Sequence, residues 1–299
     1  MKKVYLDYAA STPVDKKVLE EILPYFLEKY GNPSSIHQFG QEAIEAIDKA
    51  REQVADFLHC NASEIIFTSG ATESNNLTIK GVVKATQTEN PNIITSVIEH
   101  SCVLNSCGTA VKDKIANVSF VKVNKEGIVN PEDIRNAIRK NTVLVSIMYG
   151  NNEVGTIQPI AEIGKVIKEI NKDREKNQLP KVYFHTDAVQ AVNYLDCNVD
   201  NLGVDFLSLS GHKIHCPKGV GVLYIKKGSK INSVQQGGGQ EYNLRAGTHN
   251  VPGIVGIGKA ISLVLENRKK MDEIRTLRDY MIDEILKNIS DSELNGSKE

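Results

Sequence analysis

Four short segments of the sequence place residues that can do chemistry directly after apolar runs typical of buried strands. The first, Thr68-Ser-Gly-Ala-Thr72-Glu73, turns through glycine toward a helix. Free backbone N–H groups and hydroxyls at such a turn can bind an anion such as phosphate. Taken alone, a helix capped by Thr72 is the simpler interpretation, and the segment matches neither a Walker A sequence nor a dinucleotide-binding motif.

The second and third segments add an acid and an amine. Phe184-His-Thr-Asp187-Ala-Val-Gln190 places a carboxylate after a strand and a carboxamide three residues later. Asp187 could pair with a charged ring nitrogen while Gln190 donates to a nearby oxygen, although Asp187 could also cap the next helix. Ser208-Leu-Ser210-Gly-His212-Lys213 ends in a lysine. A lysine in a pocket can form a Schiff base, but a lone lysine after a strand is usually solvated.

The fourth segment contributes His100, which follows the strand predicted at 93–96. A single histidine is more often structural than catalytic, but in a parallel sheet the residues that follow the strands meet at one edge, where ligands bind. The four segments then supply an anion site, an acid, a stacking imidazole and a Schiff-base lysine. Pyridoxal phosphate needs all of these groups to anchor its phosphate, keep its ring nitrogen protonated and hold its aldehyde. The sequence therefore predicts a pyridoxal phosphate site.

The spacing of apolar residues along the chain predicts the helices and strands that position these segments. Amphipathic patterns predict helices over 38–58, from about 73 to 85 and from about 254 to 289, the last with a break near Arg268. Asn130 and Pro131 mark the start of a helix over 131–140. Short unbroken apolar strands that alternate with helices predict a mostly parallel α/β sheet covered on both faces. The strands are expected at 65–68, 93–96, 118–121, 143–147, 182–184, 206–209 and 220–225.

Composition narrows the class of protein. The 299 residues are enough for one large domain or two ordinary ones. A formal net charge of −1 argues against a protein that binds nucleic acid or an anionic membrane surface. No apolar run approaches the roughly 20 residues that span a bilayer, and the N-terminus does not read as a signal peptide. We therefore expect a cytoplasmic protein whose partner is a small molecule or another protein.

The five cysteines are odd in number, irregularly spaced and without a Cys-x-x-Cys pair. Neither a disulfide framework nor a zinc site follows from such a pattern, and no metal centre is predicted. We expect most of these cysteines to be small buried residues in a reducing compartment.

Over nearly its whole length the sequence resembles the class V aminotransferases, and specifically the cysteine desulfurases of the NifS/IscS type. The resemblance implies the type I fold of pyridoxal phosphate enzymes, with a large cofactor-binding domain over 15–267 and a partial small α+β domain over 1–14 and 268–299. It rests on the order and spacing of Tyr5-Leu-Asp-Tyr-Ala-Ala-Ser-Thr-Pro13, Gly31-Asn-Pro-Ser34, Phe67-Thr-Ser-Gly-Ala-Thr-Glu73, Glu99-His100, Asn151-Asn-Glu-Val-Gly155, His185-Thr-Asp187-Ala-Val-Gln190, Ser208-Leu-Ser-Gly-His-Lys213 and Arg245-Ala-Gly-Thr248.

The resemblance also implies a role for each site residue. Lys213 is expected to hold the cofactor as a Schiff base and to move protons at the substrate Cα, and His100 to stack on the ring. Asp187 would pair with the pyridinium nitrogen and Gln190 would contact the phenolic oxygen. Thr248 matches a residue that reaches the phosphate of the partner subunit, which implies a homodimer. The other implied contacts are Ala71, Thr72, Ser210 and His212 at the phosphate and Asn152 near the ring and the substrate carboxylate.

The implied reaction takes sulfur from L-cysteine and leaves L-alanine and an enzyme persulfide, which feeds iron–sulfur cluster assembly or tRNA thiolation through an acceptor or scaffold protein. By the same resemblance, the nucleophilic cysteine and the arginine that binds the substrate carboxylate are expected beyond Glu299, in about a hundred further residues. None of the cysteines present matches the nucleophile's motif. Cys216 and Cys102 lie near Lys213 and His100 in the sequence and are interpreted as structural.

Other functions remain open on the sequence alone. A selenocysteine lyase or an aminotransferase would use the same cofactor and fold without a protein thiol. A non-catalytic remnant would bind the cofactor, and a dimer or scaffold partner, without completing sulfur transfer.

Overall fold

Seven strands form one sheet in the computed structural model, which describes residues 3–298. Strands β6, β5, β4, β2 and β3 run parallel to one another, whereas β7 is antiparallel to both β1 and β6. The predicted mostly parallel α/β sheet is therefore confirmed. In the order in which they lie side by side, the strands are β1 (Ile65–Thr68), β7 (Gly221–Ile225), β6 (Phe206–Ser210), β5 (Tyr183–Asp187), β4 (Thr142–Ser146), β2 (Asn92–Ser96) and β3 (Asn117–Val121).

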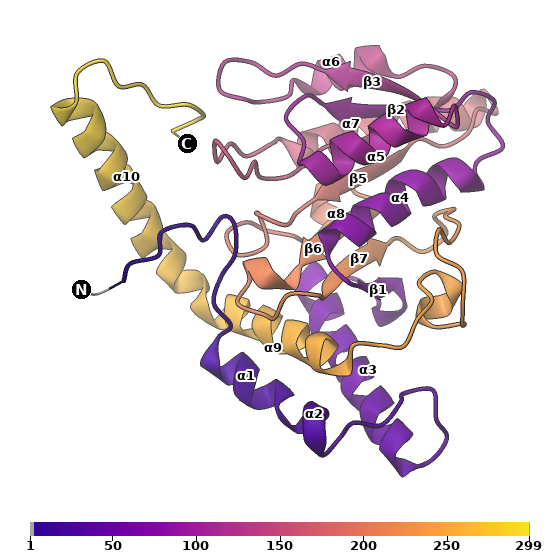
Figure 1. Cartoon of the computed structure of the whole chain (residues 1–299). Helices are drawn as coiled ribbons and strands as arrows, with labels where there is room; N and C mark the ends of the chain where they lie inside the picture. The colour runs from indigo at the N-terminus through magenta and orange to yellow at the C-terminus, as the bar shows by residue number, and fades with distance from the viewer. Residues whose placement is uncertain (1–2, 299) are drawn as a thin grey trace.

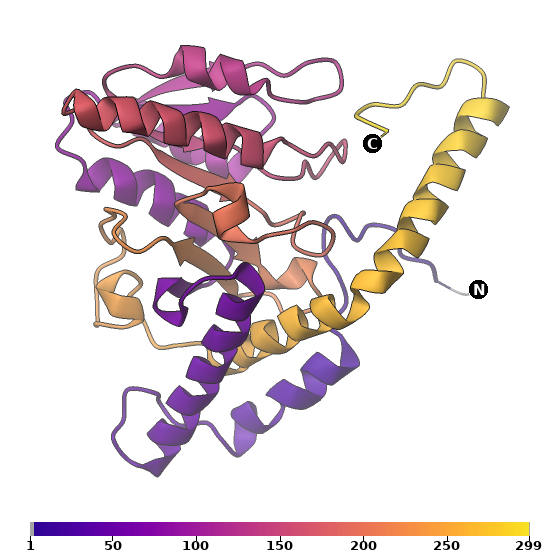
Figure 2. The ribbon, with the colours of Figure 1, turned by 180° about the vertical axis from the view of Figure 1, so that it is seen from behind.

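Helices cover both faces of the sheet (Figures 1 and 2). Helices α4 (Ala71–Ala85) and α5 (Ser101–Lys112) lie on one face, and α3 (Gln38–Leu58), α7 (Ile160–Lys176) and α8 (Val199–Leu202) on the other. Successive strand residues point to opposite faces, so Ile93 packs into the core under α4 and α5 while Ile94 packs into the larger core on the other side. Burial on both faces explains why the central strands are rich in apolar residues.

The remaining helices are α1 (Lys16–Ile22), α2 (Pro24–Leu27), α6 (Pro131–Ala137), α9 (Val251–Asn267) and α10 (Met271–Asn288). Asn130 caps α6 as predicted, but α6 ends at Ala137 rather than at 140 because Ile138 takes an extended backbone. Among residues 3–298, no helix combines the length and the apolar character needed to cross a membrane. Single 3₁₀ turns lie at Ala62–Glu64, Gly211–Lys213, Glu241–Asn243 and Arg268–Lys270.

The helical pattern predicted from 254 to 289 with a break near Arg268 forms two helices, so the predicted break is confirmed. A 3₁₀ turn at Arg268–Lys270 separates α9, which packs against α3 and α1, from α10, which extends away from the sheet (Figures 1 and 2). Helix α9 buries eleven of its residues, whereas no described residue of α10 is buried. The turn lies where the domain over 15–267 is predicted to end, and that division stays a prediction.

Candidate functional site

A cavity of about 690 Å³ opens at the carboxyl ends of the parallel strands, next to the start of α4. Its volume is in the usual range for a site that holds a small organic ligand. The structure places Thr248 outside this cavity, exposed in the loop before α9. Of the residues predicted from the sequence, the cavity is lined by Ala71, Thr72, His100, Asn152, Asp187, Gln190, Ser210, His212 and Lys213.

The turn between β1 and α4 forms one wall. Gly70, at φ 151° and ψ 173°, is the residue before α4, and no side chain in the described structure caps this helix end. The alternative that Thr72 caps the helix is therefore wrong, because α4 begins at Ala71 and Thr72 already lies in its first turn. The first backbone N–H groups of a helix carry partial positive charge, and without a cap they are available to an anion in the cavity.

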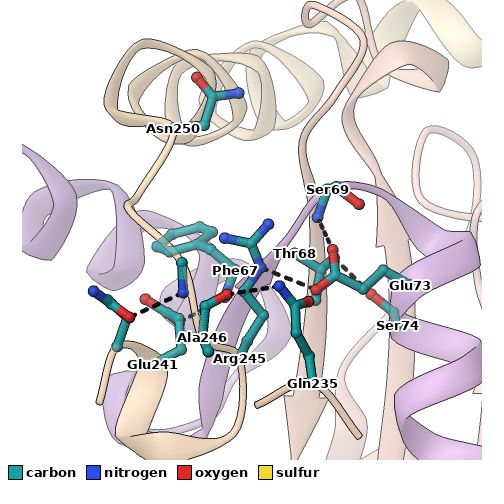
Figure 3. A network of polar contacts seen from close by, with 12 residues as sticks. Phe67, Thr68, Ser69, Glu73, Ser74, Gln235, Glu241, Arg245, Ala246 and Asn250 are labelled. Carbon is teal, nitrogen blue, oxygen red and sulfur yellow. Dashed lines mark hydrogen bonds and ion pairs between the residues drawn. The ribbon is translucent and has the colours of Figure 1, made fainter. Parts of the chain in front are cut away.

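Glu73 holds this turn in place (Figure 3). Its Oε2 accepts a hydrogen bond from the backbone N–H of Ser69 at 2.6 Å, and its Oε1 accepts one from Arg245 Nε at 2.9 Å. Burial raises the pKa of Glu73, but the hydrogen bonds from Ser69 and Arg245 outweigh burial and hold that pKa below its ordinary value. The turn is thus tied to the segment that carries Thr248.

Asp187 ends β5 as a buried carboxylate. Its Oδ2 accepts a hydrogen bond from Asn75 Nδ2 at 2.7 Å, and its Oδ1 accepts one from the backbone N–H of Val189 at 3.0 Å. Burial raises the pKa of Asp187, and these two donors, with nearby His100 and Lys213, act in the opposite direction. A carboxylate held in this way is suited to pair with a cationic nitrogen of a ligand.

Lys213 lies half-buried in the 3₁₀ turn that follows β6, so it is not the solvated lysine of the simpler interpretation. Its Nζ donates to the backbone oxygens of Ala9 and Ala10. Burial lowers the pKa of Lys213 more than the carboxylates of Asp7 and Asp187 raise it. A lowered pKa increases the share of neutral amine, which is the nucleophilic form.

The N-terminal segment forms a side of the site to which sequence reasoning assigned no role. Asp7, Ala9, Ala10 and Ser11 line the cavity, and Gln190 Nε2 donates to the backbone oxygen of Ala9 at 3.0 Å. Segment 5–13 contributes to the family resemblance, but it precedes the first strand and its sequence has no motif or hydrophobic period that predicts a role in the site. Its contact with Lys213 depends on the folded chain.

Cys216 and Cys102 differ in burial and in whether they line the cavity. Cys216 is fully buried, and burial raises the pKa of its thiol, so the structural interpretation of Cys216 agrees with its surroundings. Cys102, by contrast, lines the cavity beside His100. All five cysteines are free thiols.

These groups fit pyridoxal phosphate. An uncapped helix end, a buried carboxylate held by two donors and an amine of lowered pKa surround one cavity, and they match the phosphate, the ring nitrogen and the aldehyde of that cofactor. The parallel sheet with a ligand cavity at its carboxyl edge is the type I fold of pyridoxal phosphate-dependent enzymes.

Comparison with known proteins identifies the family within this fold. Residues 4–299 match the model of the aminotransferase class-V family, and the chain belongs to that family. Cysteine desulfurase IscS of Dictyoglomus turgidum is 51% identical over 99% of this chain and 73% of that relative. Cysteine desulfurase IscS of Methanosarcina thermophila is 48% identical over 99% of this chain and 70% of that relative.

Solved structures agree with this assignment. A NifS-like protein superposes with a TM-score of 0.89 at 41% identity, over 96% of this chain and 76% of the other. A structure described as SspA in complex with cysteine gives a TM-score of 0.81 at 44% identity, over 87% of this chain and 72% of the other.

Proposed function

We propose that the chain is a pyridoxal phosphate-dependent cysteine desulfurase. It would convert L-cysteine to L-alanine as the sulfur moves from the substrate to a cysteine thiol, whose motif none of the five described cysteines matches. The persulfide formed on that thiol would pass the sulfur, through an acceptor or scaffold protein, to iron–sulfur cluster assembly or tRNA thiolation. The observation that carries the proposal is the convergence of Lys213, Asp187 and the uncapped end of α4 on one cavity. Relatives named cysteine desulfurase and a neighbour solved with cysteine support the choice of substrate.

Each wall of the cavity has a part in holding the cofactor. The backbone of Ala71 and Thr72 would hold the phosphate, together with Ser210 and His212. When bound, the cofactor supplies an electron sink for the charge that develops at the substrate Cα. Asp187 would keep a proton on the ring nitrogen, because a buried carboxylate stabilises a cation beside it. His100, Gln190 and Asn152 also line the cavity, and they would contact the ring, the phenolic oxygen and the substrate carboxylate respectively.

Lys213 would hold the cofactor covalently and would take the Cα proton of the substrate. Its lowered pKa favours both roles, because a neutral amine is at once a nucleophile and a base. The backbone oxygens of Ala9 and Ala10 fix the position of the Nζ atom in the cavity.

The protein acts as a homodimer in this proposal. Thr248 lies outside the cavity of its own chain, as expected for a residue that serves the partner subunit. Apolar side chains are exposed nearby in the chain's N-terminal part, with Leu27 83% and Ile36 95% exposed. The free thiols agree with a cytoplasmic location, where thiols stay reduced.

A selenocysteine lyase or aminotransferase of the same fold is the second candidate. The observation in its favour is that the thiols stay protonated at neutral pH. Burial raises the pKa of Cys60, Cys107 and Cys197 to about 12. It raises the pKa of Cys102 to about 11. Thiols of such high pKa are weak nucleophiles at neutral pH. These two activities need no protein thiol.

The deciding experiment supplies the purified chain with pyridoxal phosphate, a reductant and L-cysteine, and quantifies sulfide and alanine. L-Selenocysteine and an amino donor with a keto acid are tested in parallel. Alanine and sulfide in equal amounts support the proposal. Turnover of only the other substrates overturns it in favour of the second candidate, and cofactor binding without any turnover reduces the function to binding alone.

Lys213→Ala tests the site itself. We expect this variant to lose both the visible absorbance of the bound cofactor and the production of alanine. Lys227→Ala, which removes an exposed lysine after β7, is the matched control and should retain both. An unchanged absorbance band in Lys213→Ala would disprove the assignment of the Schiff-base lysine.

A further inference from the structure

Asn75 is a buried residue whose side-chain amide contacts two residues that line the cavity. It lies on α4, one turn after the uncapped helix end, and its side chain is inaccessible to solvent. Its Nδ2 donates to Asp187 Oδ2 at 2.7 Å and to Cys102 Sγ at 3.1 Å. One amide therefore contacts both the acid of the site and a thiol that lines the cavity.

The orientation of this amide follows from the chemistry of its partner. An ionised carboxylate only accepts hydrogen bonds, so the atom that faces Asp187 must be the NH₂ group of Asn75. In this orientation Asn75 Oδ1 is buried and has no partner among the described residues. An unsatisfied buried acceptor is costly, and its persistence points to a function of the amide other than stability.

Cys102 continues the contact to His100. The backbone N–H of Cys102 donates to His100 Nδ1 at 3.2 Å, so Nδ1 must be unprotonated and the ring proton must lie on Nε2. Cys102 Sγ is 3.0 Å from the same Nδ1. The thiol shares this acceptor with the backbone N–H when it donates its proton to His100, and it accepts a hydrogen bond from Asn75.

These contacts form a network that connects Asp187 with His100, two residues that line the cavity. It passes from Asp187 at the end of β5, through Asn75 on α4 and Cys102 on α5, to His100 at the N-terminus of α5. A neutral thiol is required at its centre, since a thiolate has no proton to donate. Burial, together with the charge of Asp187, keeps the thiol neutral by raising the pKa of Cys102.

We propose that Asn75 and Cys102 are positioning residues of the cofactor site. Asn75 holds the carboxylate of Asp187 ionised and oriented for a ring N–H. The thiol of Cys102 links that carboxylate to the His100 ring, whose Nε2–H form is set by the backbone N–H of Cys102. The inference rests on the proposed pyridoxal phosphate site. It assigns the half-buried Cys102, interpreted from the sequence as structural only, to the support of the site.

The first test separates an effect on the ring nitrogen from a general effect on folding. Binding to the apo-protein is measured by calorimetry for pyridoxal phosphate and for an analogue in which carbon replaces the ring nitrogen. We expect Asn75→Ala to bind pyridoxal phosphate about tenfold more weakly, which is the usual effect of a lost hydrogen bond to a charged group. The analogue should bind Asn75→Ala and the unaltered protein equally well.

Thr78→Ala is the matched control on the same helix. Thr78 is also buried, but its hydroxyl donates only to the backbone oxygen of Ser74. It should leave the ratio of the two affinities unchanged. Equal weakening of both ligands by Asn75→Ala would show a merely structural role and overturn the inference. Failure of the unaltered protein to bind either ligand would instead contradict the proposed function.

The second test concerns Cys102 and uses no activity measurement. The hydrogen bonding of the His100 ring is followed in the apo-protein by nitrogen NMR after labelling of the histidines. We expect Cys102→Ala to shift the His100 ring signals and Cys102→Ser, which restores a donor and an acceptor, to bring them back. Cys107→Ala removes a fully buried thiol from the same helix and should change nothing. Unchanged His100 signals in Cys102→Ala would overturn the role of the thiol.

Discussion

Glu99 shows how a single buried carboxyl can join the ends of two strands. Its Oε1 accepts hydrogen bonds from Ser96 Oγ at 2.6 Å and from the backbone N–H of Met148 at 3.0 Å, so it bridges the ends of β2 and β4. Its Oε2 is buried without a partner in the described structure. Burial, which outweighs these hydrogen bonds, raises the pKa of Glu99 to about 8.

The raised pKa makes stability depend on pH. The unfolded chain releases the proton of Glu99 near pH 4.3, whereas the folded protein holds it up to about pH 8. Between these values the folded state binds more protons than the unfolded state, so the free energy of unfolding falls as pH rises, by at most about 1.4 kcal/mol per pH unit. Below pH 4.3 the contribution is fully present.

Glu99→Gln should remove this slope, because an amide stays neutral at every pH. We expect urea unfolding of the apo-protein to show Glu99→Gln gaining stability relative to the unaltered protein between about pH 5 and 8. Parallel stability curves for the two proteins would contradict the raised pKa of Glu99.

At the scale of elements, two segments far apart in the chain are joined at the end of the site where the phosphate is proposed to bind. The Glu73–Arg245 pair, whose side chains are 19% and 20% exposed, ties the β1–α4 turn to the loop before α9 (Figure 3). A second set of hydrogen bonds lies beside this pair. Glu241 accepts hydrogen bonds from Arg51 on α3 and from the backbone N–H of Phe67 on β1. The turn is thereby ordered before an anion arrives.

Arg245→Ala should therefore weaken binding of pyridoxal phosphate to the apo-protein several-fold, because Glu73 would lie unpaired beside the dianionic phosphate. The affinity is measured by fluorescence titration. Arg135→Ala removes an equally charged residue that pairs with Glu132 and Glu169 far from the site, and it should leave the affinity unchanged. Equal affinities for Arg245→Ala and Arg135→Ala would refute the effect.

The packing of α9 on α3 depends on a close approach of the two helices. A Cβ atom added at Gly258 would lie 2.9 Å from Ala50 Cα and 2.4 Å from Gln53 Oε1. We expect Gly258→Val to lower the free energy of unfolding by about 1–3 kcal/mol in urea titrations. Gly108→Ala in α5, with nothing within 4 Å, should instead raise it by about 0.5–1 kcal/mol. The same sign in both variants would rule out this packing argument.

At the scale of the whole molecule, exposed apolar side chains mark where a second copy is expected to bind. Leu27 and Ile36 belong to the N-terminal part of the chain, and their side chains are 83% and 95% exposed. Large exposed apolar side chains in one region typically mark an interface. These residues belong to the segment between α1 and α3, on the far side of the sheet from α5 (Figure 2).

Leu27→Glu combined with Ile36→Glu should convert the proposed dimer to monomers, since the interface would then bury two unpaired charges. Analytical ultracentrifugation reads the mass directly. Leu277→Glu, which alters an equally apolar residue 67% exposed on α10, is the control and should remain dimeric. A dimer that persists in the double variant would place the interface elsewhere.

Much of this architecture follows from local sequence signals. The helix over 38–58 and the strand over 65–68 agree with the structure at both ends, because hydrophobic period and flanking turns act over a few residues. The break near Arg268 also agrees with the structure, where a 3₁₀ turn lies at Arg268–Lys270. The end of α6 was predicted three residues too late, because the backbone of Ile138 is extended and the charge of Arg139 does not report that.

The sequence by itself determined the type and order of the elements and the chemical groups that follow each strand. Only the tertiary structure decided which of those groups meet. Asn75 contacts Asp187 across 112 positions, Glu73 contacts Arg245 across 172, and Lys213 contacts Ala10 across 203. Such contacts depend on the spatial order of the strands and on the packing of whole helices, and no local pattern encodes that order.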